Sequence, residues 1–539
     1  MDIASILRQA VDRYPDQTAL VCSDAPRRPD AAGSHDAPDG SQRWTYAEWN
    51  RRASRLAHAL SDLGVCPGDR VAIYLWNTEA SVTSYFACQK LGAVAVPLNF
   101  RLPAGELAYI LGNSGARVLV YTRDLTDAVL RAATSARGVH DFIAVKGSTV
   151  EELVGGHHDY EKLATTFPVD TEPAYTPDGG DLSALVYTSG TTGRPKGVMH
   201  THANDVAIAM NCVMEYGLRR TDRALHIAPL YHVGGMQAFF MPHLFVGGTN
   251  LLIGRYDPAR TLAVIEREAV TTLFAVPTQI AQMLDDERFA ESEVSSLRLI
   301  TTGGSALAGA TMDRVTDELC PRLFHGYGAT EASLTLLLQP EDAHAKPGSC
   351  GKPTLVTDAR IVAVDGDRRV RPDERADRGQ VGQLIVRGPQ VMKGYWNQPI
   401  ETAKRMELGW FYTGDLFTRD ADGFYHYQGR ADDLIVSGGE NIYPREVEEV
   451  LWRMPGVREC HVLGLPDPRW GQVVTAFIVP AEPGLDADDV DAFCRRSPDL
   501  ADFKRPRQVV LVDTLPRNPS GKVVKRELLA RHAPARTPP

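Results

Sequence analysis

Short apolar runs alternate with longer stretches of helical periodicity along much of the chain. Three of the runs have the length of buried strands: residues 70–75, 117–121 and 182–187. Residues 46–63 instead repeat apolar side chains at helical spacing: Trp49, Ala53, Leu56, Ala57 and Leu60. This alternation predicts an α/β fold with largely parallel sheets.

Three further segments depart from that pattern. Residues 24–43 are rich in Pro, Ala, Asp, Gly and Ser, which predicts a mobile surface loop. Residues 233–254 are the most membrane-like stretch, but polar residues and a proline interrupt it, so we expect buried core and not a membrane span. Residues 429–433 form a short polar segment, and the roughly 110 residues after it are enough for a small separate domain. We therefore expect domains at 1–431 and 432–539.

Composition limits the classes of function. The 539 residues correspond to roughly three or four units of ordinary domain size. Lys and Arg number 58 and Asp and Glu 68, so the formal net charge of -10 argues against a general electrostatic grip on nucleic acid or an anionic membrane. The 8 cysteines contain no CxxC pair and the amino-terminal residues do not form a signal peptide, so we expect a cytoplasmic protein without a disulfide framework.

A loop rich in glycine and hydroxyl groups follows the apolar run that ends at Tyr187. Residues 188–197 contain four hydroxyls, three glycines and two cations. Exposed amides and hydroxyls donate to phosphate oxygens and Lys196 adds charge, so the loop predicts polyphosphate binding. A P-loop is disfavoured, because that motif needs Gly-Lys-Ser/Thr at the start of a helix, whereas Lys196 lies between Pro195 and Gly197.

This loop is one of five segments that resemble motifs of a known family and follow one another in the same order along the chain. The other four are Tyr327-Gly328-Ala329-Thr330-Glu331, Tyr412-Thr413-Gly414-Asp415, the stretch from Gly429-Arg430 through Ser437-Gly438-Gly439-Glu440-Asn441-Ile442-Tyr443-Pro444, and Pro516-Arg517-Asn518-Pro519-Ser520-Gly521-Lys522. Together they cover nearly the whole chain, which resembles the adenylate-forming superfamily of acyl-CoA synthetases, adenylation domains and luciferases. The resemblance implies a large N-terminal domain of stacked mixed β-sheets flanked by helices, and a small mobile α+β C-terminal domain.

The chemistry that the resemblance implies joins a carboxylate to the α-phosphate of ATP. Because two anions must meet, catalysis consists mainly of alignment and charge neutralisation. By resemblance Glu331 binds Mg2+, a hard cation suited to carboxylate oxygens, and Asp415 accepts hydrogen bonds from the ribose hydroxyls with Arg430 beside it. Thr330 is assigned to the α-phosphate and Tyr327 to the adenine. The β- and γ-phosphates are assigned to Thr188, Ser189, Thr191, Thr192 and Lys196.

Lys522 and Asp432 are the residues that the resemblance connects with domain movement. Lys522 lies in a Pro/Gly-rich turn, from which a long cationic side chain can reach another domain and stabilise the transferring phosphate. Taken alone, such a lysine is most often a solvated surface charge. Only the match of the surrounding residues to the family motif favours a catalytic role. Asp432 matches the hinge about which the small domain rotates before the second half-reaction; without the flanking match it is an ordinary linker residue.

The second half-reaction hands the acyl group to a thiol. Gly438 and Gly439 have no side chains to block a narrow passage, as the pantetheine arm of coenzyme A requires, which favours thioester formation. Residues 467–472 and 501–507 look like those of aryl-CoA ligases of the 4-chlorobenzoate-activating kind. That comparison assigns the CoA nucleotide to Trp470, Phe503, Arg505 and Arg101. Buried core of the small domain is an equally good interpretation of the two aromatic rings.

His232 matches a family position beside the acyl pocket, where it gates access and orients the carboxylate. The competing interpretation is a core histidine. Gly303, Gly304 and Gly326 match pocket-lining strands, and their small size would leave volume for a ring or chain. The other histidine groups show no acidic or cysteine partners at useful spacing, so no metal site is predicted at His157-His158, His200/His202 or His243.

These observations predict an AMP-forming carboxylic acid:CoA ligase that uses ATP, Mg2+ and coenzyme A and passes through an acyl adenylate. The acid is expected to be aromatic and benzoate-like. Four alternatives stay open: a medium- or long-chain fatty acid as substrate, a carrier-protein thiol as acceptor, a non-catalytic nucleotide sensor on the same fold, and a luciferase-like oxygenase. A homodimer is compatible with the pattern, and no nucleic-acid partner or stable membrane insertion is expected.

Overall fold

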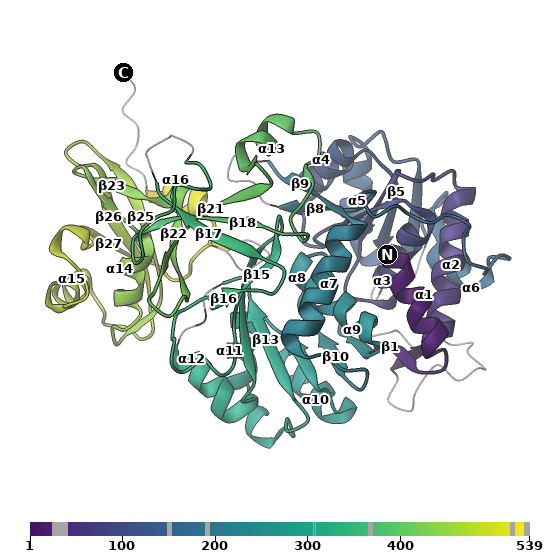
Figure 1. Cartoon of the computed structure of the whole chain (residues 1–539), viewed down its shortest axis with the longest axis horizontal. Coiled ribbons are helices and arrows are strands. Elements are labelled where there is room, and N and C mark those ends of the chain that lie inside the picture. Colours follow the sequence, from purple (N-terminus) through teal and green to yellow (C-terminus); the bar gives the residue numbers. More distant parts are fainter. Residues whose placement is uncertain are drawn as a thin grey trace. The chain divides into compact units, whose positions relative to one another are not determined.

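The computed structural model (Figure 1) describes residues 1–23, 41–147, 153–188, 194–305, 307, 309–364, 370–517 and 523–532. The chain divides into two compact units, the first Met1–Ala359 with Val386–Phe411 and the second Arg360–Ile385 with Tyr412–Pro539. The domain boundary expected after residue 431 stays a prediction. Of the loop expected at 24–43, residues 24–40 lie outside the described part, while Gln42 and Arg43 belong to a strand.

The first unit contains two large sheets of mixed strand direction. One has nine strands in the order β16-β15-β14-β13-β12-β10-β11-β1-β2. Its central pairs are parallel, whereas β2 at one edge and β15 and β16 at the other pair antiparallel. The strands are β1 (Thr18–Cys22), β2 (Gln42–Thr45), β10 (Arg223–His226), β11 (Thr249–Leu252), β12 (Thr272–Phe274), β13 (Leu299–Gly303), β14 (Leu323–Ala329), β15 (Ser333–Leu338) and β16 (Lys352–Pro353).

The other sheet of this unit has eight strands in the order β19-β9-β8-β4-β3-β5-β6-β7. Strand β9 pairs antiparallel with both β8 and β19, and the remaining pairs are parallel. This mixture confirms the mixed sheets that the family resemblance implies. The strands are β3 (Arg70–Tyr74), β4 (Val94–Pro97), β5 (Ala116–Thr122), β6 (Asp141–Val145), β7 (His158–Asp159), β8 (Leu182–Thr188), β9 (Lys196–Thr201) and β19 (Gly394–Tyr395).

The eight-stranded sheet is covered on both faces, which explains why its strands are continuous apolar runs and not alternating ones. Along β3, Val71 and Ile73 join a cluster with residues of α1, α2 and α3, whereas Ala72 and Tyr74 join a cluster with residues of α4 and α5. The helices of this unit are α1 (Ile3–Arg13), α2 (Tyr46–Asp62), α3 (Glu79–Leu91), α4 (Ala104–Ser114), α5 (Thr126–Ala133), α6 (Tyr160–Thr166), α7 (His202–Tyr216), α8 (Val233–Gly235), α9 (Met241–Val246), α10 (Pro258–Glu268), α11 (Pro277–Leu284), α12 (Gly309–Arg314) and α13 (Pro399–Arg405).

Helix α2 forms where its periodicity predicts and begins at a capping box. The Glu48 N–H donates to Thr45 Oγ1 at 3.2 Å, and the Thr45 N–H donates to the Glu48 carboxylate at 2.8 Å. All five apolar side chains of its expected stripe are fully buried. The membrane-like stretch 233–254 is also buried core, as α8, α9 and β11. In the part of the chain that the structure describes, no helix has the length and apolar character needed to cross a membrane.

The second unit has its own five-stranded sheet, in the order β24-β23-β26-β25 with β27 beside β26. Its pairs are antiparallel except β26 with β27. A further sheet has the order β17-β18-β21-β20 with β22 beside β21, and the division between the units falls within β17, β18 and β21. The remaining elements are β17 (Asp358–Val362), β18 (Gly382–Arg387), β20 (Met406–Glu407), β21 (Trp410–Arg419), β22 (Tyr425–Arg430), β23 (Ile435–Ser437), β24 (Glu440–Ile442), β25 (Val457–Asp467), β26 (Gly471–Pro480), β27 (Gln508–Leu511), α14 (Pro444–Leu451), α15 (Ala487–Arg496) and α16 (Lys525–His532).

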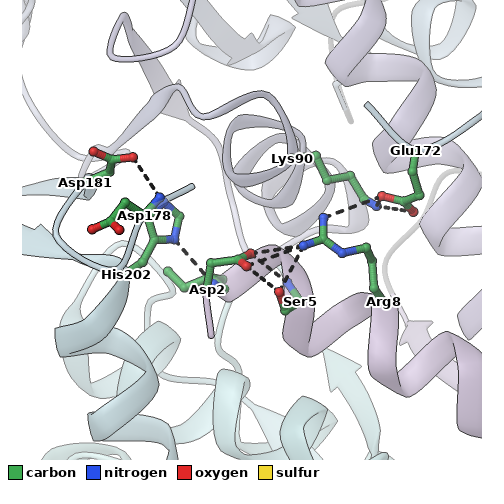
Figure 2. Close-up of polar contacts among 9 residues, drawn as sticks. Asp2, Ser5, Arg8, Lys90, Glu172, Asp178, Asp181 and His202 are labelled. Atoms are coloured by element: carbon green, nitrogen blue, oxygen red, sulfur yellow. Dashed lines mark hydrogen bonds and ion pairs between the residues drawn. The ribbon is translucent and has the colours of Figure 1, made fainter. Parts of the chain in front are cut away.

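Polar contacts attach α1 to the rest of the first unit (Figure 2). Asp2 caps the helix by accepting from the Ser5 N–H at 2.8 Å, and the Ile3 N–H donates to His202 Nδ1 at 3.3 Å. Nearby, the fully buried ammonium of Lys90 donates to both carboxylate oxygens of Glu172 at 2.6 Å. Burial lowers the pKa of Lys90 to about 8, although the charge of Glu172 acts in the opposite direction.

Candidate active site

The hairpin of β8 and β9 positions the predicted phosphate-binding residues. Thr188 ends β8 and Lys196 begins β9, and the two are paired across the hairpin. Gly197 packs closely beside them, because a Cβ there would lie 3.1 Å from the ring of Tyr187, its partner across the hairpin, and the ring would have to shift. The residues predicted to contact phosphate between the strands, Ser189, Thr191 and Thr192, lie outside the described residues.

Lys196 is held by a carboxylate that sequence reasoning missed. Its Nζ lies 2.7 Å from Glu401 Oε2 and 5.5 Å from the centroid of the Tyr395 ring. Hydrogen bonds from Lys196 and Lys404 lower the pKa of Glu401 to about 2. Glu401 lies on α13 and Tyr395 on β19, which pairs with β9, so strand pairing brings both residues to Lys196 from about 200 positions away in the chain.

The turn between β14 and β15 carries Thr330 and Glu331. The Tyr395 hydroxyl donates to Glu331 Oε1 at 2.8 Å, and the Met392 N–H donates to the Glu331 carbonyl at 2.8 Å. Tyr395 therefore contacts both predicted ATP-binding charges of this unit, the ammonium of Lys196 and the carboxylate of Glu331. Tyr327 lies on β14, before the register shift of this hairpin.

Gly303 and Gly326 are partners on β13 and β14, and close packing explains both. A Cβ at Gly303 would lie 2.6 Å from the Gly326 carbonyl oxygen, and one at Gly326 would lie 2.6 Å from Leu334 Cδ1. Gly304 has φ +84°, with nothing within 4 Å of a Cβ. Their predicted role as pocket-lining residues stays a prediction.

His232 lies directly before α8 and is half-buried. Its ring is 4.5 Å from the ring of Tyr231, which lines a small cavity together with residues of β3 and β4 and the segments that follow them. Burial raises the pKa of Tyr231 to about 12. His232 thus lies next to a cavity-lining side chain, and its role as a gate stays a prediction.

Arg101, predicted to contact CoA, is exposed beside a row of aromatic rings. Its guanidinium carbon lies 5.5 Å from the Phe100 ring, which lies 4.2 Å from the ring of Trp76. The guanidinium carbon of a second arginine, Arg255, lies 4.2 Å from the centroid of the Trp76 ring. Sequence reasoning missed Arg255 and Trp76, because neither belongs to a motif.

Within the second unit, the predicted ribose carboxylate and its neighbour are paired. Asp415 on β21 and Arg430 on β22 are partners across the hairpin, and Arg430 Nη1 lies 3.0 Å from Asp415 Oδ1. A weaker contact of 3.9 Å joins Arg430 Nη2 to Asp432 Oδ2, the predicted hinge residue. Burial and the charge of Asp415 raise the pKa of Tyr427. Lys522 lies outside the described residues.

The predicted CoA residues of the second unit differ in how accessible they are. Trp470 and Phe503 are 42% and 46% exposed, which excludes the alternative that they are buried core. Gly438 and Gly439 form the turn between β23 and β24, both with positive φ, and a Cβ at Gly438 would lie 2.8 Å from the Trp470 ring. Arg505, in contrast, is buried and already forms ion pairs with Asp491 and Asp502.

Two of the histidines for which spacing along the chain predicts no acidic partner lie beside aspartates in the fold. His158 Nε2 lies 3.0 Å from Asp141 Oδ1 across neighbouring strands, and His200 Nδ1 lies 3.2 Å from Asp205 Oδ1. The first pair needs sheet pairing and the second a turn from strand to helix, so spacing along the chain does not reveal either. His243 bonds Thr272 within the core.

Comparisons with known proteins identify the family of this chain. The model of the AMP-binding enzyme family matches residues 7–396, and that of the AMP-binding enzyme C-terminal domain matches residues 446–522. A feruloyl-CoA synthase from Amycolatopsis sp is 40% identical over 495 residues, covering 91% of this chain and 94% of the relative. A long-chain-fatty-acid–CoA ligase of Mycobacterium tuberculosis is 34% identical (92% and 94% covered), and a fatty acid–[acyl-carrier-protein] ligase of Streptomyces coeruleorubidus is 35% identical (90% and 91%).

Solved structures agree with these relatives. ATP-bound MatB from Rhodopseudomonas palustris has a TM-score of 0.84 at 29% identity, with 99% of each chain covered. The anthranilate CoA ligase AuaEII in complex with anthranoyl-AMP has a TM-score of 0.85 at 27% identity, with 99% of this chain and 97% of that chain covered. These similarities confirm the resemblance and the fold class predicted from the motifs.

Proposed function

Because this chain belongs to the AMP-binding enzyme family, we propose that it activates an aromatic carboxylic acid with Mg2+ and ATP and transfers the acyl group to the thiol of coenzyme A. Membership confirms the coarser prediction, an ATP-dependent acyl-CoA ligase of the adenylate-forming kind. The aromatic acid is the finer part of the proposal. It is supported above all by the 40% identity to a feruloyl-CoA synthase over 91% of the chain.

In the first half-reaction, a carboxylate oxygen of the acid attacks the α-phosphorus of ATP and pyrophosphate leaves. Lys196 would pair with the departing phosphates and Thr330 with the α-phosphate, so that charge is neutralised where it accumulates. The Glu331 carboxylate, oriented by the Tyr395 hydroxyl, suits Mg2+, which when bound offsets the charge of the phosphates. Asp415 would hold the ribose, and Lys522 would stabilise the forming bond.

In the second half-reaction, the CoA thiolate attacks the acyl carbon and AMP leaves with the bonding electron pair. The exposed rings of Trp470 and Phe503 support a nucleotide-binding role, because each has a cationic neighbour: Arg469 at 4.6 Å and Lys504 at 5.7 Å from the respective ring. Arg101 would meet CoA from the first unit, Asp432 would act as the hinge, and His232 would gate the acid site. The eight cysteines form no disulfide, which supports a cytoplasmic enzyme.

The proposal is tested by screening CoA-dependent AMP release over benzoates, cinnamates and fatty acids of increasing length, and by measuring acid-dependent pyrophosphate release without CoA. We expect aromatic acids to give the highest kcat/KM. A preference for fatty acids would overturn the choice of acid but keep the reaction. Pyrophosphate release followed by transfer only to carrier proteins, and never to CoA, would overturn the choice of acceptor.

A further inference from the structure

A histidine and an aspartate form a fully buried pair behind the turn that carries Thr330 and Glu331. His200 lies on β9 and Asp205 on the first turn of α7, and neither side chain is exposed. His200 Nδ1 lies 3.2 Å from Asp205 Oδ1, which is ion-pair distance, and neither atom has a hydrogen-bond partner among the described residues. The other carboxylate oxygen of Asp205 accepts from Ser183 Oγ at 2.7 Å.

The contact of His200 with Thr330 defines where one hydrogen of the imidazole lies. His200 Nε2 is 2.9 Å from the carbonyl oxygen of Thr330. A carbonyl oxygen can only accept, so Nε2 carries a hydrogen and donates it. On the other side of the ring, Nδ1 lies within ion-pair distance of the Asp205 carboxylate. The imidazole ring is therefore held with Nε2–H directed at Thr330 and with Nδ1 towards Asp205.

This donation fixes one peptide plane in the turn. The Thr330–Glu331 peptide is trans, so with its carbonyl directed at His200 its N–H points in the opposite direction. On the other side of Glu331, the Met392 N–H holds the carbonyl. Two residues later, Ser333 has φ +48°, a left-handed conformation that serine rarely adopts. The turn is therefore held at defined points by residues distant in the chain.

A buried pair of polar side chains is an inefficient way to stabilise a fold. Removing two polar groups from water is costly, and apolar side chains of similar volume in a core often give equal or greater stability. At His200 and Asp205 the fold keeps the polar pair, and the ring nitrogen of His200 that faces away from Asp205 donates to Thr330. The geometry therefore favours a role in orienting the peptide that joins Thr330 to Glu331.

We propose that His200 and Asp205 are positioning residues for adenylate formation, which set the orientation of the peptide joining Thr330 to Glu331. The inference rests on the proposed function, which assigns these two residues to the α-phosphate and to Mg2+. The pair itself contacts no substrate and acts through the turn. Its loss should slow the attack on ATP without changing how the acid is bound.

The test compares two double variants that differ only in the donor to Thr330. H200L/D205N removes the donor, and H200Q/D205N restores one, because the Gln amide nitrogen reaches the place of Nε2. The D205N change avoids an unpaired buried charge, and its amide oxygen can still accept from Ser183. A matched control, H243L, removes another fully buried histidine of this unit, whose Nδ1 and Nε2 contact Phe239 and Thr272. Unfolding midpoints are measured for all of them.

We expect kcat of acid-dependent pyrophosphate release to fall about 10- to 100-fold in H200L/D205N, with the KM for the acid within about threefold of the wild type. H200Q/D205N should recover to within about fivefold, and H243L should lower only the unfolding midpoint. Equal rates in the two double variants, whether both normal or both lost, would overturn the proposal. If H200L/D205N does not fold, H200M/D205N takes its place, with the same expectation.

Binding of Mg·ATP separates this inference from the proposed function. If the wild type releases no pyrophosphate with any acid, the proposed function fails, and titration with Mg and a non-hydrolysable ATP analogue still tests the pair. We expect a Kd about tenfold weaker in H200L/D205N and restored in H200Q/D205N. Identical Kd values in the two double variants would overturn the inference in that case as well.

Discussion

Glu401 forms an ion pair with Lys196, whose ammonium is proposed to bind the phosphates of ATP. The substitution E401Q should therefore change the KM for Mg·ATP. Its Oε2 lies 2.7 Å from Lys196 Nζ, and its Oε1 lies 2.7 Å from Lys404 Nζ. On the proposed role of Lys196, the phosphates of ATP compete with Glu401 for its ammonium. The Tyr395 ring, whose centroid lies 5.5 Å from the ammonium, should still keep the Lys196 side chain in place when the carboxylate is removed. We expect E401Q to lower the KM for Mg·ATP.

The magnitude follows from the carboxylate's titration. A pKa of about 2 against an ordinary value of 4.5 corresponds to about 3.4 kcal/mol, shared between two lysines. Glu401 is a quarter exposed, and solvent screening leaves about 1 kcal/mol for Lys196, or about a fivefold lower KM. Because the pKa is depressed, the carboxylate stays ionised from about pH 5 upward, and the stabilisation is lost only as pH falls from 4.5 towards 2. The change in KM should therefore not depend on pH between about 6 and 9.

The assay is acid-dependent pyrophosphate release at varied Mg·ATP and constant ionic strength. K404A is the matched control, since it removes the other partner of Glu401 but leaves the contact with Lys196, and its KM should stay within about twofold of the wild type. An unchanged or higher KM for ATP in E401Q would contradict this expectation, because it would show that Glu401 assists the lysine and does not compete with phosphate.

Three further substitutions test other parts of the molecule. K522A should abolish adenylate formation and spare thioester formation from a supplied acyl adenylate; equal loss in both steps would contradict a role confined to the first. D415A should raise the KM for ATP about tenfold or more, because the ribose loses a charged acceptor; an unchanged KM would remove the ribose assignment. K90M should raise the free energy of unfolding at pH 7 by about 1 kcal/mol in chemical denaturation, since burial disfavours the ammonium, and the wild type should gain stability as pH rises from 8 towards 10.5. Destabilisation by K90M would show that its contacts with Glu172 outweigh burial.

The elements with strong apolar patterning were predictable from the sequence. Strands β3, β5 and β8 and helix α2 form where the pattern places them, because burial on both sheet faces and along one helix face leaves a clear signature. Residues 42–43 were assigned to a loop on composition, yet they pair with β1. Their extended conformation depends on pairing with β1, which the composition of the segment does not predict.

The candidate site was predictable only where residues belong to contiguous motifs. Lys196, Glu331 and Asp415 each lie in a short conspicuous segment, but Tyr395, Glu401 and Asp205 do not. Those three reach the site through the antiparallel pairing of β19 with β9, the start of α13 and the turn into α7. A partner brought by sheet pairing from about 200 residues away carries no signal in spacing, and an aspartate on the first turn of a helix is ordinarily explained by the helix dipole.

The glycines of the predicted acid pocket show how one residue type supports two physical explanations. Small size at Gly303 and Gly326 suggested open volume for a substrate, yet the Cβ positions are filled by the Gly326 carbonyl and by the end of Leu334. At Gly303 the obstruction is backbone, so alanine there would strain the contact between β13 and β14. At Gly326 it is the tip of a flexible side chain, which can move. The fold should therefore tolerate G326A better than G303A, which a smaller fall of the unfolding midpoint in G326A would show, and equal falls would contradict this explanation. If Gly326 also lines the acid pocket as predicted, G326A should change the ratio of kcat/KM between benzoates and fatty acids.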